Sequence, residues 1–487
     1  MLSTSSKLSF GIGSAAEGVK NVAFSLFLLF FYVQVHGLSA SLAGMALFIA
    51  LCFDAISDPV AGYISDSWRS RWGRRHPFMY AAAIPLGIAF YFVFTPPEDL
   101  GQWALFAWLT GFTILTRAAM TLYYVPHMAL GAELSDDYEE RTSIVSYRTA
   151  FSIFGALAVY GTVGIFFPEG EDGARGQLNN DNYPSFALTC GLVMWLTIWI
   201  SAGGTHKEIP RLRTSEVKPE PFNFLGVFRE TKIALTNKNF RVVFLAVLSS
   251  YVMNGVNVAL SLFVFTFFWE LSAQDMQMVL MIMPFGVLLG IPFTKFIHRR
   301  FDKKPAIVFS MAWWAVLQVL PVMLRLVGFF PDNGASELAY ILAGIAFLQG
   351  VGTSFGTVTV GSMIADIVDE QELVTGRRQE GTFFAALSFS AKATSGLGGL
   401  VAGVGLDLIN WPQAEAIQSA AKMDPEIITR LGLLFGPLVA FFGIAAIWFY
   451  SLYNLDRAKH TAILTELRKK RANTSENNLD DAVAQPV

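Results

Sequence analysis

The sequence predicts an all-α membrane protein with twelve transmembrane helices in two pseudo-symmetric six-helix bundles. Of its 487 residues, 53% are hydrophobic and only 15% are charged, whereas about a quarter of the residues in a soluble domain are charged. The charges gather between long apolar runs, as in multi-pass membrane proteins. A polar stretch, 204–238, divides these runs into two sets of six.

Each apolar run is long enough to cross the hydrocarbon core, which takes about 20 helical residues. The first run begins near Leu8 and is too long for a signal peptide, so we assign it as the first helix. The twelve predicted spans are 8–34, 39–64, 78–95, 102–132, 143–167, 183–203, 239–268, 274–297, 306–328, 337–368, 379–408 and 430–453.

The spans predict four units along the chain. They are an N-terminal bundle (1–203), a central loop (204–238), a C-terminal bundle (239–453) and a tail (454–487). Lysine and arginine gather in alternate loops, while the loops on the other side contain only Arg175 and Lys422. Because basic loops stay in the cytoplasm, both termini and the central loop are predicted to be cytoplasmic.

The two halves contain a repeated loop pattern. Segment 71–77 lies between spans two and three, and segment 300–305 lies between spans eight and nine. Both read arginine, aromatic residue, turn residue and two bases, with a proline near the next helix start. Matching positions in two six-span halves indicate an internal repeat, as found in transporters.

Asp54 and Asp58 are the most informative residues of the chain. They lie one helical turn apart on one face of span two. Counted back from Asp66, they are about 18 and 12 Å deep, near the membrane midplane. Intramembrane carboxylates usually mark ion pathways, so we expect a cation or proton site that includes the adjacent Ser57. The alternative is a structural salt bridge with a buried base.

Span four presents further polar residues toward this pair. Arg117, Thr121 and Tyr124 share one face because they follow helical spacing. Thr121 can offer its hydroxyl oxygen to a cation, and Arg117 can pair with a carboxylate in the place a metal ion would take. Tyr123 and Tyr124 can stack on a sugar ring, or they can serve as ordinary packing.

Three basic residues lie within predicted spans. Lys392 is about 21 Å into span eleven and cannot easily reach the membrane surface. We expect Lys392 and Arg148 to line a substrate cavity, with an inter-helix lock as the alternative. Lys20 is a further substrate-binding candidate, although Glu17, three residues away, is an alternative ion-pair partner.

Charged residues at the cytoplasmic ends of the spans are candidates for a gate. Bridges between basic loops and acidic helix ends could hold the inward side closed, and a solvated charge run is the alternative. The predicted gate residues are Arg71, Arg74, Arg75, Arg141, Asp366 and Asp369.

Several classes of function have no support in the sequence. It contains no phosphate loop, metalloprotease motif, nucleophile elbow or dinucleotide fingerprint. We therefore expect no enzyme, no cofactor and no metal site other than Na⁺ at Asp54 and Asp58. No basic domain suggests nucleic acid. The tail begins with a basic amphipathic stretch, 457–471, which we expect to lie on membrane lipid.

These motifs resemble the glycoside–pentoside–hexuronide:cation symporters, a melibiose-permease-like branch of the major facilitator superfamily. The resemblance covers about 10–453, and its most specific part is segment 53–62 followed by the basic segment 69–74. Further similar elements are Val125-Pro126, Tyr147-Arg148, 365–369 and Lys392.

The resemblance implies secondary active symport of a sugar, glycoside or hexuronide, coupled to H⁺ or Na⁺. It implies the major facilitator fold, alternating access, and a multi-pass protein of the bacterial inner membrane that works as a monomer. It assigns Asp54, Asp58 and Thr121 to the cation site, and Arg148 and Lys392 to the cavity.

Two departures from the family pattern bear on specificity. Val19 and Tyr124 stand where acidic residues hold galactosyl hydroxyls in the melibiose permease, and Arg117 replaces a small residue. A guanidinium near the carboxylates disfavours Na⁺ and suggests proton coupling or no coupling. Because Arg148 and Lys392 are kept, we expect an anionic or bulkier amphipathic substrate, such as a uronide, a sulfonated sugar or an oligosaccharide.

The main alternative within transport is a cation-coupled carrier of lysophospholipid or another amphiphile. Lysophospholipid symporters of the same superfamily share the Asp-Ala-Ile-x-Asp-Pro element and a lysine in span eleven. A non-transporting receptor is disfavoured because the chain has no large soluble appendage.

Overall fold

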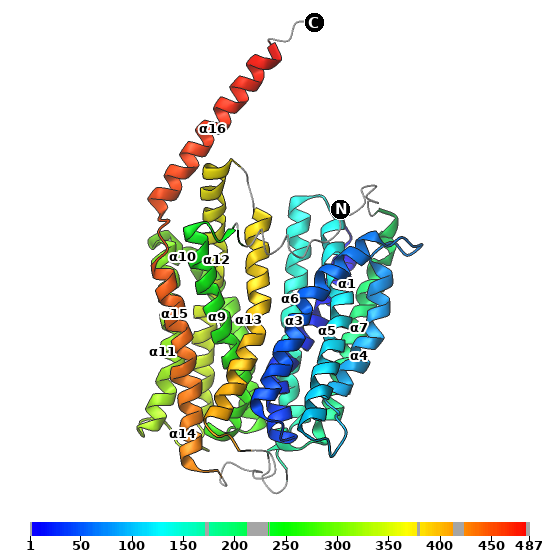
Figure 1. Cartoon of the computed structure of the whole chain (residues 1–487), viewed down its shortest axis with the longest axis vertical. Coiled ribbons are helices and arrows are strands. Elements are labelled where there is room, and N and C mark those ends of the chain that lie inside the picture. The colour runs from blue at the N-terminus through cyan, green and yellow to red at the C-terminus, as the bar shows by residue number, and fades with distance from the viewer. Residues whose placement is uncertain are drawn as a thin grey trace.

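The computed structural model describes residues 2–170, 175–211, 232, 234–376, 380–412 and 423–483. These residues form a bundle of long, roughly parallel helices with one helix projecting beyond it (Figure 1). Both termini lie on the same side of the bundle, which we call the terminal face. The predicted cytoplasmic location of this face remains a prediction.

The first six spans form the N-terminal half. Its first span is continuous from α1 (Thr4–Ile12) through α2 (Ser14–Phe30) to the π-helical η1 (Phe31–Val35). The remaining elements are α3 (Ala40–Ser67), α4 (His76–Val93), α5 (Gln102–Glu133), α6 (Tyr138–Phe166), η2 (Gly176–Leu178), α7 (Asn182–Thr205) and η3 (His206–Arg211).

The second six spans form the C-terminal half. They are α9 (Lys238–Phe263) with η4 (Val264–Phe268), α10 (Ala273–Arg300), α11 (Lys303–Leu326), α12 (Leu338–Thr375), α13 (Glu380–Leu408), and α14 (Pro425–Leu433) with η7 (Leu434–Leu438) and α15 (Val439–Ser451).

Each of the twelve predicted spans coincides with a helix or with a continuous run of two or three helical elements. Among the described residues, eleven helices are long and apolar enough to cross a membrane. The twelfth predicted span corresponds to α13, whose segment Gly396–Leu408 is apolar. Helix α12 continues to Thr375, beyond the predicted end at 368, because a helix can extend into water past its apolar part.

Side-chain caps help to set where several helices begin. Asp137 accepts a hydrogen bond from the backbone N–H of Glu140 at the start of α6. Asn237 and Ser272 cap α9 and α10 in the same way. Such caps satisfy backbone N–H groups that the helix itself cannot pair.

The tail forms a helix, α16 (Arg457–Val483), which projects away from the bundle beyond the terminal face (Figure 1). It is attached to the C-terminal half through His460, which lies 3.0 Å from a carboxylate oxygen of Asp369. Arg457 donates a hydrogen bond to the carbonyl of His298. The expectation that segment 457–471 lies flat on lipid remains a prediction, and the central loop falls mostly outside the described residues.

The two halves are joined by hydrogen bonds at the face opposite the termini. Asp407 at the end of α13 accepts hydrogen bonds from the Ser39 hydroxyl and the Ser41 N–H at the start of α3. Trp411 donates to Gln34 over 2.9 Å. In the part of the chain that the structure describes, every hydrogen bond between the halves lies at or near this face.

Close helix contact reinforces this junction. Helices α3 and α13 pack along each other. A Cβ atom at Gly403 of α13 would lie 2.2 Å from the carbonyl oxygen of Ala40, and one at Gly44 would lie 2.8 Å from that of Gly399. Glycine therefore allows the two backbones to approach here, as small residues do in membrane helix packing.

Candidate functional site

Asp54 and Arg117 form an ion pair between neighbouring helices of the N-terminal half. Nη1 of Arg117 on α5 donates a hydrogen bond to Oδ2 of Asp54 on α3. Each side chain is 14% exposed. The other carboxylate oxygen, Oδ1, is buried and accepts no hydrogen bond from a described residue. Half of this carboxylate is therefore still available to a cation, a proton or a water molecule.

Asp58 has a different partner, one turn further along α3. The Thr121 hydroxyl donates a hydrogen bond to Oδ1 of Asp58 over 2.7 Å. Thr121 is buried and Asp58 is partly buried. Arg117 and Thr121 are four residues apart on α5, as Asp54 and Asp58 are on α3. This equal spacing places each residue of α5 opposite its partner on α3.

Both carboxylates line a cavity of about 390 Å³, which we call the ionic cavity. Helices α2, α3 and α5 supply its wall from one half, and α9 and α13 supply it from the other. Its polar and charged lining residues are Glu17, Lys20, Asn21, Ser25, Asp54, Asp58, Arg117, Thr121, Tyr124 and Asn254. The position of this cavity between two six-helix halves is the position of a transporter's substrate site.

Glu17 belongs to this cavity wall, which the sequence analysis did not predict. Glu17 is three residues from Lys20, and this spacing suggested an ion pair between the two. The ion pairs of the described residues do not include a Glu17–Lys20 pair. Lys20 is 7% exposed and lies near Arg117 and Asp54. The helical spacing of Glu17, Asn21 and Ser25 was the available signal, because it places all three on one face of α2.

The described wall of the ionic cavity does not carry an excess of positive charge. Glu17, Asp54 and Asp58 are acidic, whereas Lys20 and Arg117 are basic. Arg148, expected to line the cavity, instead has Nη1 at 2.7 Å from the Met128 sulfur and is absent from the lining. The argument for an anionic substrate from excess positive charge therefore has no support in the described residues.

The remaining predicted residues lie in several places. Tyr123 is fully buried and stacks on His127, with 5.1 Å between ring centroids, so it is away from the ionic cavity. The Ser57 hydroxyl is buried without a hydrogen bond to a described residue and is also absent from the lining. Lys392 is on α13, but its side chain lies outside the described part of the structure.

The predicted gate residues of the N-terminal half bond within that half. Arg74 and Arg75 donate hydrogen bonds to Oε1 of Glu133 at the end of α5, over 2.9 and 2.8 Å. Arg75 also pairs with Asp66. Arg141 lies 3.5 Å from Asp136 of the same half.

Asp366 and Asp369 form an equivalent cluster in the C-terminal half. Nζ of Lys303 lies 2.6 Å from Asp366 at the terminal-face end of α12. The ring of His460 on α16 lies 3.4 Å from Asp366 and 3.0 Å from Asp369. Lys303 occupies the position of Arg74 in the repeated loop pattern, so both halves pair this loop with the fourth span of the same half.

Neither cluster contains an ion pair between the halves among the described residues. Arg71 lies over the ring of its neighbour Trp72, with 5.7 Å to the ring centroid. Among the described residues, the ion pairs of the predicted gate residues therefore each lie within one half. Their action as a gate remains a prediction for another conformation.

The described residues contain no group of three or more histidine, cysteine, aspartate or glutamate side chains suited to hold a metal ion. The oxygen atoms that the sequence analysis predicted as cation ligands, those of Asp54, Asp58 and Thr121, lie together on α3 and α5, and their role in binding a cation remains a prediction. Sodium prefers several oxygen ligands, and the Arg117 guanidinium already contributes a positive charge to the site. A proton needs only one carboxylate oxygen.

Comparison with known proteins identifies the class of protein that this fold and cavity define. Residues 9–457 match the family model of MFS/sugar transport proteins, so the chain belongs to this major facilitator family and to its glycoside–pentoside–hexuronide symporters. It is a multi-pass transporter of the inner membrane, and the family and its solved structural neighbours are transporters and not enzymes.

Three relatives illustrate the range of the family. The putative glycoside/cation symporter YagG of Escherichia coli is 28% identical, with 99% of each chain covered. The isoprimeverose transporter of Lactiplantibacillus pentosus is 23% identical over 96% of this chain and 92% of the relative. The sphingosine-1-phosphate transporter MFSD2B of Xenopus tropicalis is 25% identical over 97% and 93%.

A solved structure supports the fold. A bacterial homologue of the human lysosomal transporter Spinster, in an inward-facing and unoccupied conformation, aligns with a TM-score of 0.59. The alignment covers 95% of this chain and 96% of that chain at 12% identity.

Proposed function

We propose that this protein is a proton-coupled symporter that carries a glycoside by alternating access. The observation behind the proposal is that two intramembrane carboxylates with different partners lie in one cavity between the halves. Asp54 is paired with Arg117, and Asp58 accepts a hydrogen bond from Thr121. The relatives named as glycoside/cation symporter and isoprimeverose transporter support a sugar-type substrate.

Charge balance favours H⁺ over Na⁺ in this proposal. Because Arg117 is paired with Asp54, the proposal places the transported proton on Asp58, the other carboxylate of the cavity. A proton on Asp58 neutralises it without further ligands, whereas Na⁺ would be repelled by the adjacent guanidinium. Buried charges are expensive in a low-dielectric site, which links proton binding to closure.

The substrate in this proposal is a neutral glycoside. Glu17 and Tyr124 lie close enough to interact, and Asn21 and Asn254 add amide groups to the same wall. These groups accept and donate hydrogen bonds to hydroxyls. Once Asp54 is paired and Asp58 is protonated, the charges of Glu17 and Lys20 balance each other among the described lining residues, which suits a neutral sugar.

The test is uptake by purified protein in proteoliposomes under an inward pH gradient, an inward Na⁺ gradient or no gradient. Radiolabelled neutral glycosides and uronides are compared for wild type, Asp58→Asn and a control, Asp332→Asn, whose carboxylate is 94% exposed. We expect the pH gradient alone to drive accumulation, and Asp58→Asn to abolish accumulation while leaving substrate exchange. Accumulation driven by Na⁺, or equal uptake without any gradient, would contradict the proposal.

An amphiphile carrier is the second candidate. It is favoured by the sphingosine-1-phosphate transporter among the relatives and by a mostly apolar cavity beside the ionic one. Coupled uptake of a lysolipid, with no uptake of any glycoside in the same vesicles, would select it.

A further inference from the structure

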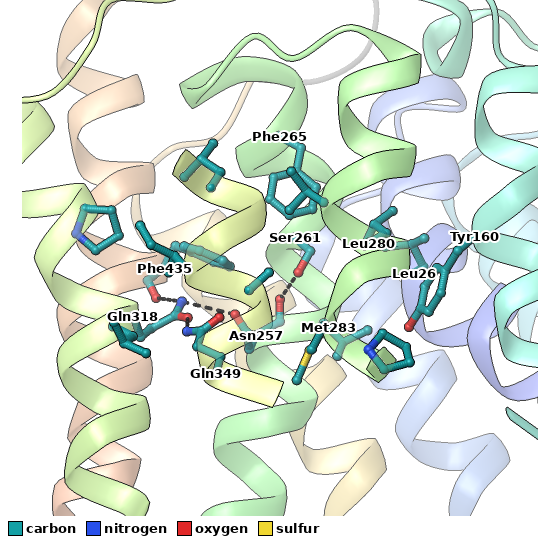
Figure 2. A pocket seen from close by; sticks show the side chains of 18 of the residues that line it. Leu26, Tyr160, Asn257, Ser261, Phe265, Leu280, Met283, Gln318, Gln349 and Phe435 are labelled. Atoms are coloured by element: carbon teal, nitrogen blue, oxygen red, sulfur yellow. Dashed lines mark hydrogen bonds between the residues drawn. The ribbon is translucent and has the colours of Figure 1, made fainter. Parts of the chain in front are cut away.

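A second cavity of about 360 Å³ lies beside the ionic cavity, mainly within the C-terminal half. We call it the amide pocket, because Asn257, Gln318 and Gln349 supply its main polar groups (Figure 2). Val258 of α9 lines both cavities, so they adjoin at this residue. The N-terminal half closes one side of the amide pocket with Leu26 of α2 and Tyr160 of α6.

The three amides come from three different helices and bond to one another. Gln318 of α11 donates hydrogen bonds from Nε2 to Oδ1 of Asn257 on α9, over 3.1 Å, and to the Phe435 carbonyl, over 3.0 Å. Gln349 of α12 donates from Nε2 to Oε1 of Gln318 over 3.1 Å. Gln318 is 4% exposed and therefore acts as a fixed centre that positions the other two amides.

This network leaves hydrogen-bonding capacity at the cavity. Nδ2 of Asn257 and Oε1 of Gln349 make no hydrogen bond with any described residue, and neither is among the fully buried polar atoms. One is a donor and the other an acceptor. Polar groups at membrane depth are costly unless they are paired or face a wet or ligand-filled cavity.

Apart from the hydroxyl-bearing side chains of Tyr160 and Ser261, the rest of the wall is apolar and uncharged. Phe265, Leu280, Met283 and Phe435 surround the amides. Among the residues that the structure describes, no acidic or basic side chain lines this pocket. A ligand group that fits here is hydrophobic overall and carries an uncharged donor or acceptor.

We propose that the amide pocket is a second substrate subsite, which takes an apolar aglycone bearing a hydroxyl or amide group. This inference rests on the proposed function, with the sugar held in the ionic cavity and the aglycone extending past Val258. A plain acyl chain fits less well, because it would leave Asn257 and Gln349 unpaired against hydrocarbon. A charged group would find no counter-charge.

The substrate of this carrier is then a glycoside whose apolar aglycone, such as an aryl group, bears a hydroxyl or amide group, rather than a free monosaccharide. Burying an aromatic aglycone should raise the affinity by at least about tenfold. The subsite also spans both halves, so an aglycone there would be in contact with surfaces that separate during alternating access.

The experiment measures binding of methyl, phenyl and 4-hydroxyphenyl glycosides of common hexoses and pentoses to the purified full-length protein. Two variants alter the subsite: Gln349→Leu removes the terminal amide, and Leu280→Trp fills the pocket. The matched control, Leu288→Trp, makes the same change on the same helix at a side chain that is 45% exposed. Thermal unfolding of each variant establishes that it is folded.

We expect 4-hydroxyphenyl glycosides to bind at least about tenfold more tightly than the corresponding methyl glycosides. Gln349→Leu should reduce the preference for 4-hydroxyphenyl over phenyl, and Leu280→Trp should abolish the aryl preference without changing methyl glycoside affinity. Equal affinity for aryl and methyl glycosides in the wild type would overturn the subsite while leaving glycoside transport intact. Binding of lysolipids alone would overturn both the subsite and the proposed function.

Discussion

Arg117 of α5 is hydrogen-bonded to Asp54 of α3 inside the N-terminal half, in the wall of the ionic cavity. The guanidinium takes one carboxylate oxygen and leaves the other, Oδ1, buried and without a hydrogen bond from a described residue. A carboxylate that already has a fixed positive partner has less need of a metal ion. The pair therefore favours a carrier that moves protons at Asp58.

Replacing Arg117 by glutamine should convert the site into one that responds to Na⁺. The substitution leaves Asp54 uncompensated, and breaking one side of a buried ion pair typically costs about 3–5 kcal/mol. We expect Arg117→Gln to lower the melting temperature, and NaCl but not choline chloride to recover part of it. The double variant Arg117→Gln/Asp54→Asn should be more stable than Arg117→Gln alone. A single variant as stable as wild type would show that the ion pair contributes nothing.

Removing the Thr121 hydroxyl should impair proton coupling. Thr121→Val keeps the shape of the side chain but cannot donate to Asp58, and a hydrogen bond to a charged group is worth about 1.5–3 kcal/mol. We expect proton-driven uptake to fall by roughly tenfold, because a loss of about 1.4 kcal/mol corresponds to a factor of ten, and we expect the pH profile of uptake to change. Thr121→Ser should retain uptake close to wild type. A valine variant with an unchanged rate and pH profile would contradict this role.

The close contact between α3 and α13 should tolerate no added methyl group. A Cβ atom at Gly403 would lie 2.2 Å from the Ala40 carbonyl oxygen, so Gly403→Ala must separate the two helices. We expect at least a tenfold loss of transport and a lower melting temperature. The matched control is Gly344→Ala on α12, where nothing lies within 4 Å of the added atom. There alanine should be neutral or stabilising by up to about 1 kcal/mol.

Acidic pH should weaken the protein at the face opposite the termini. His36 lies in the short connection between η1 and α3, where burial lowers its pKa to about 4, although its hydrogen bond with Asn180 acts in the other direction. The ordinary pKa of histidine is about 6.5, so between these values the unfolded chain binds more protons than the folded protein. Stability from this group is present above pH 6.5 and is lost as the pH falls toward 4.

We therefore expect the free energy of unfolding to fall by about 1–2 kcal/mol between pH 7 and pH 5 through His36 alone. The measurement is the melting temperature against pH for wild type and His36→Phe, which keeps an aromatic ring beside Phe31. The phenylalanine variant should show a flatter profile. Identical profiles for both proteins would exclude His36 as a source of the pH dependence.

The helices could be predicted almost completely from the sequence, because a membrane leaves few alternatives to apolar helices of fixed length. The Asp54–Arg117 contact was also among the alternatives that the sequence raised. Helical spacing likewise explains the different positions of two adjacent tyrosines: Tyr124 follows the face of Arg117 and Thr121 into the cavity. Tyr123, one residue earlier, is turned by about 100° toward the packed interior.

Other parts of the site could not be predicted from the spacing of residues along a single helix. Glu17 sits three residues from Lys20, which resembles a local pair, and only the packing of α2 against the other helices places both in the cavity wall. Asn257, Gln318 and Gln349 lie in three separate spans. Nothing within any one helix indicates that they meet, because the meeting depends on how α9, α11 and α12 pack together.

The arrangement of ion pairs has a consequence for how the chain can be divided. Arg75–Glu133 and Lys303–Asp366 are each contained within one half, and the described hydrogen bonds between halves lie near one face. Each half thus contains the ion pair that stabilises its own end at the terminal face. We expect the two halves to associate in the bilayer and to transport substrate when they are co-expressed as separate polypeptides, 1–211 and 232–487. The covalent link between them would then act mainly by raising their effective concentration.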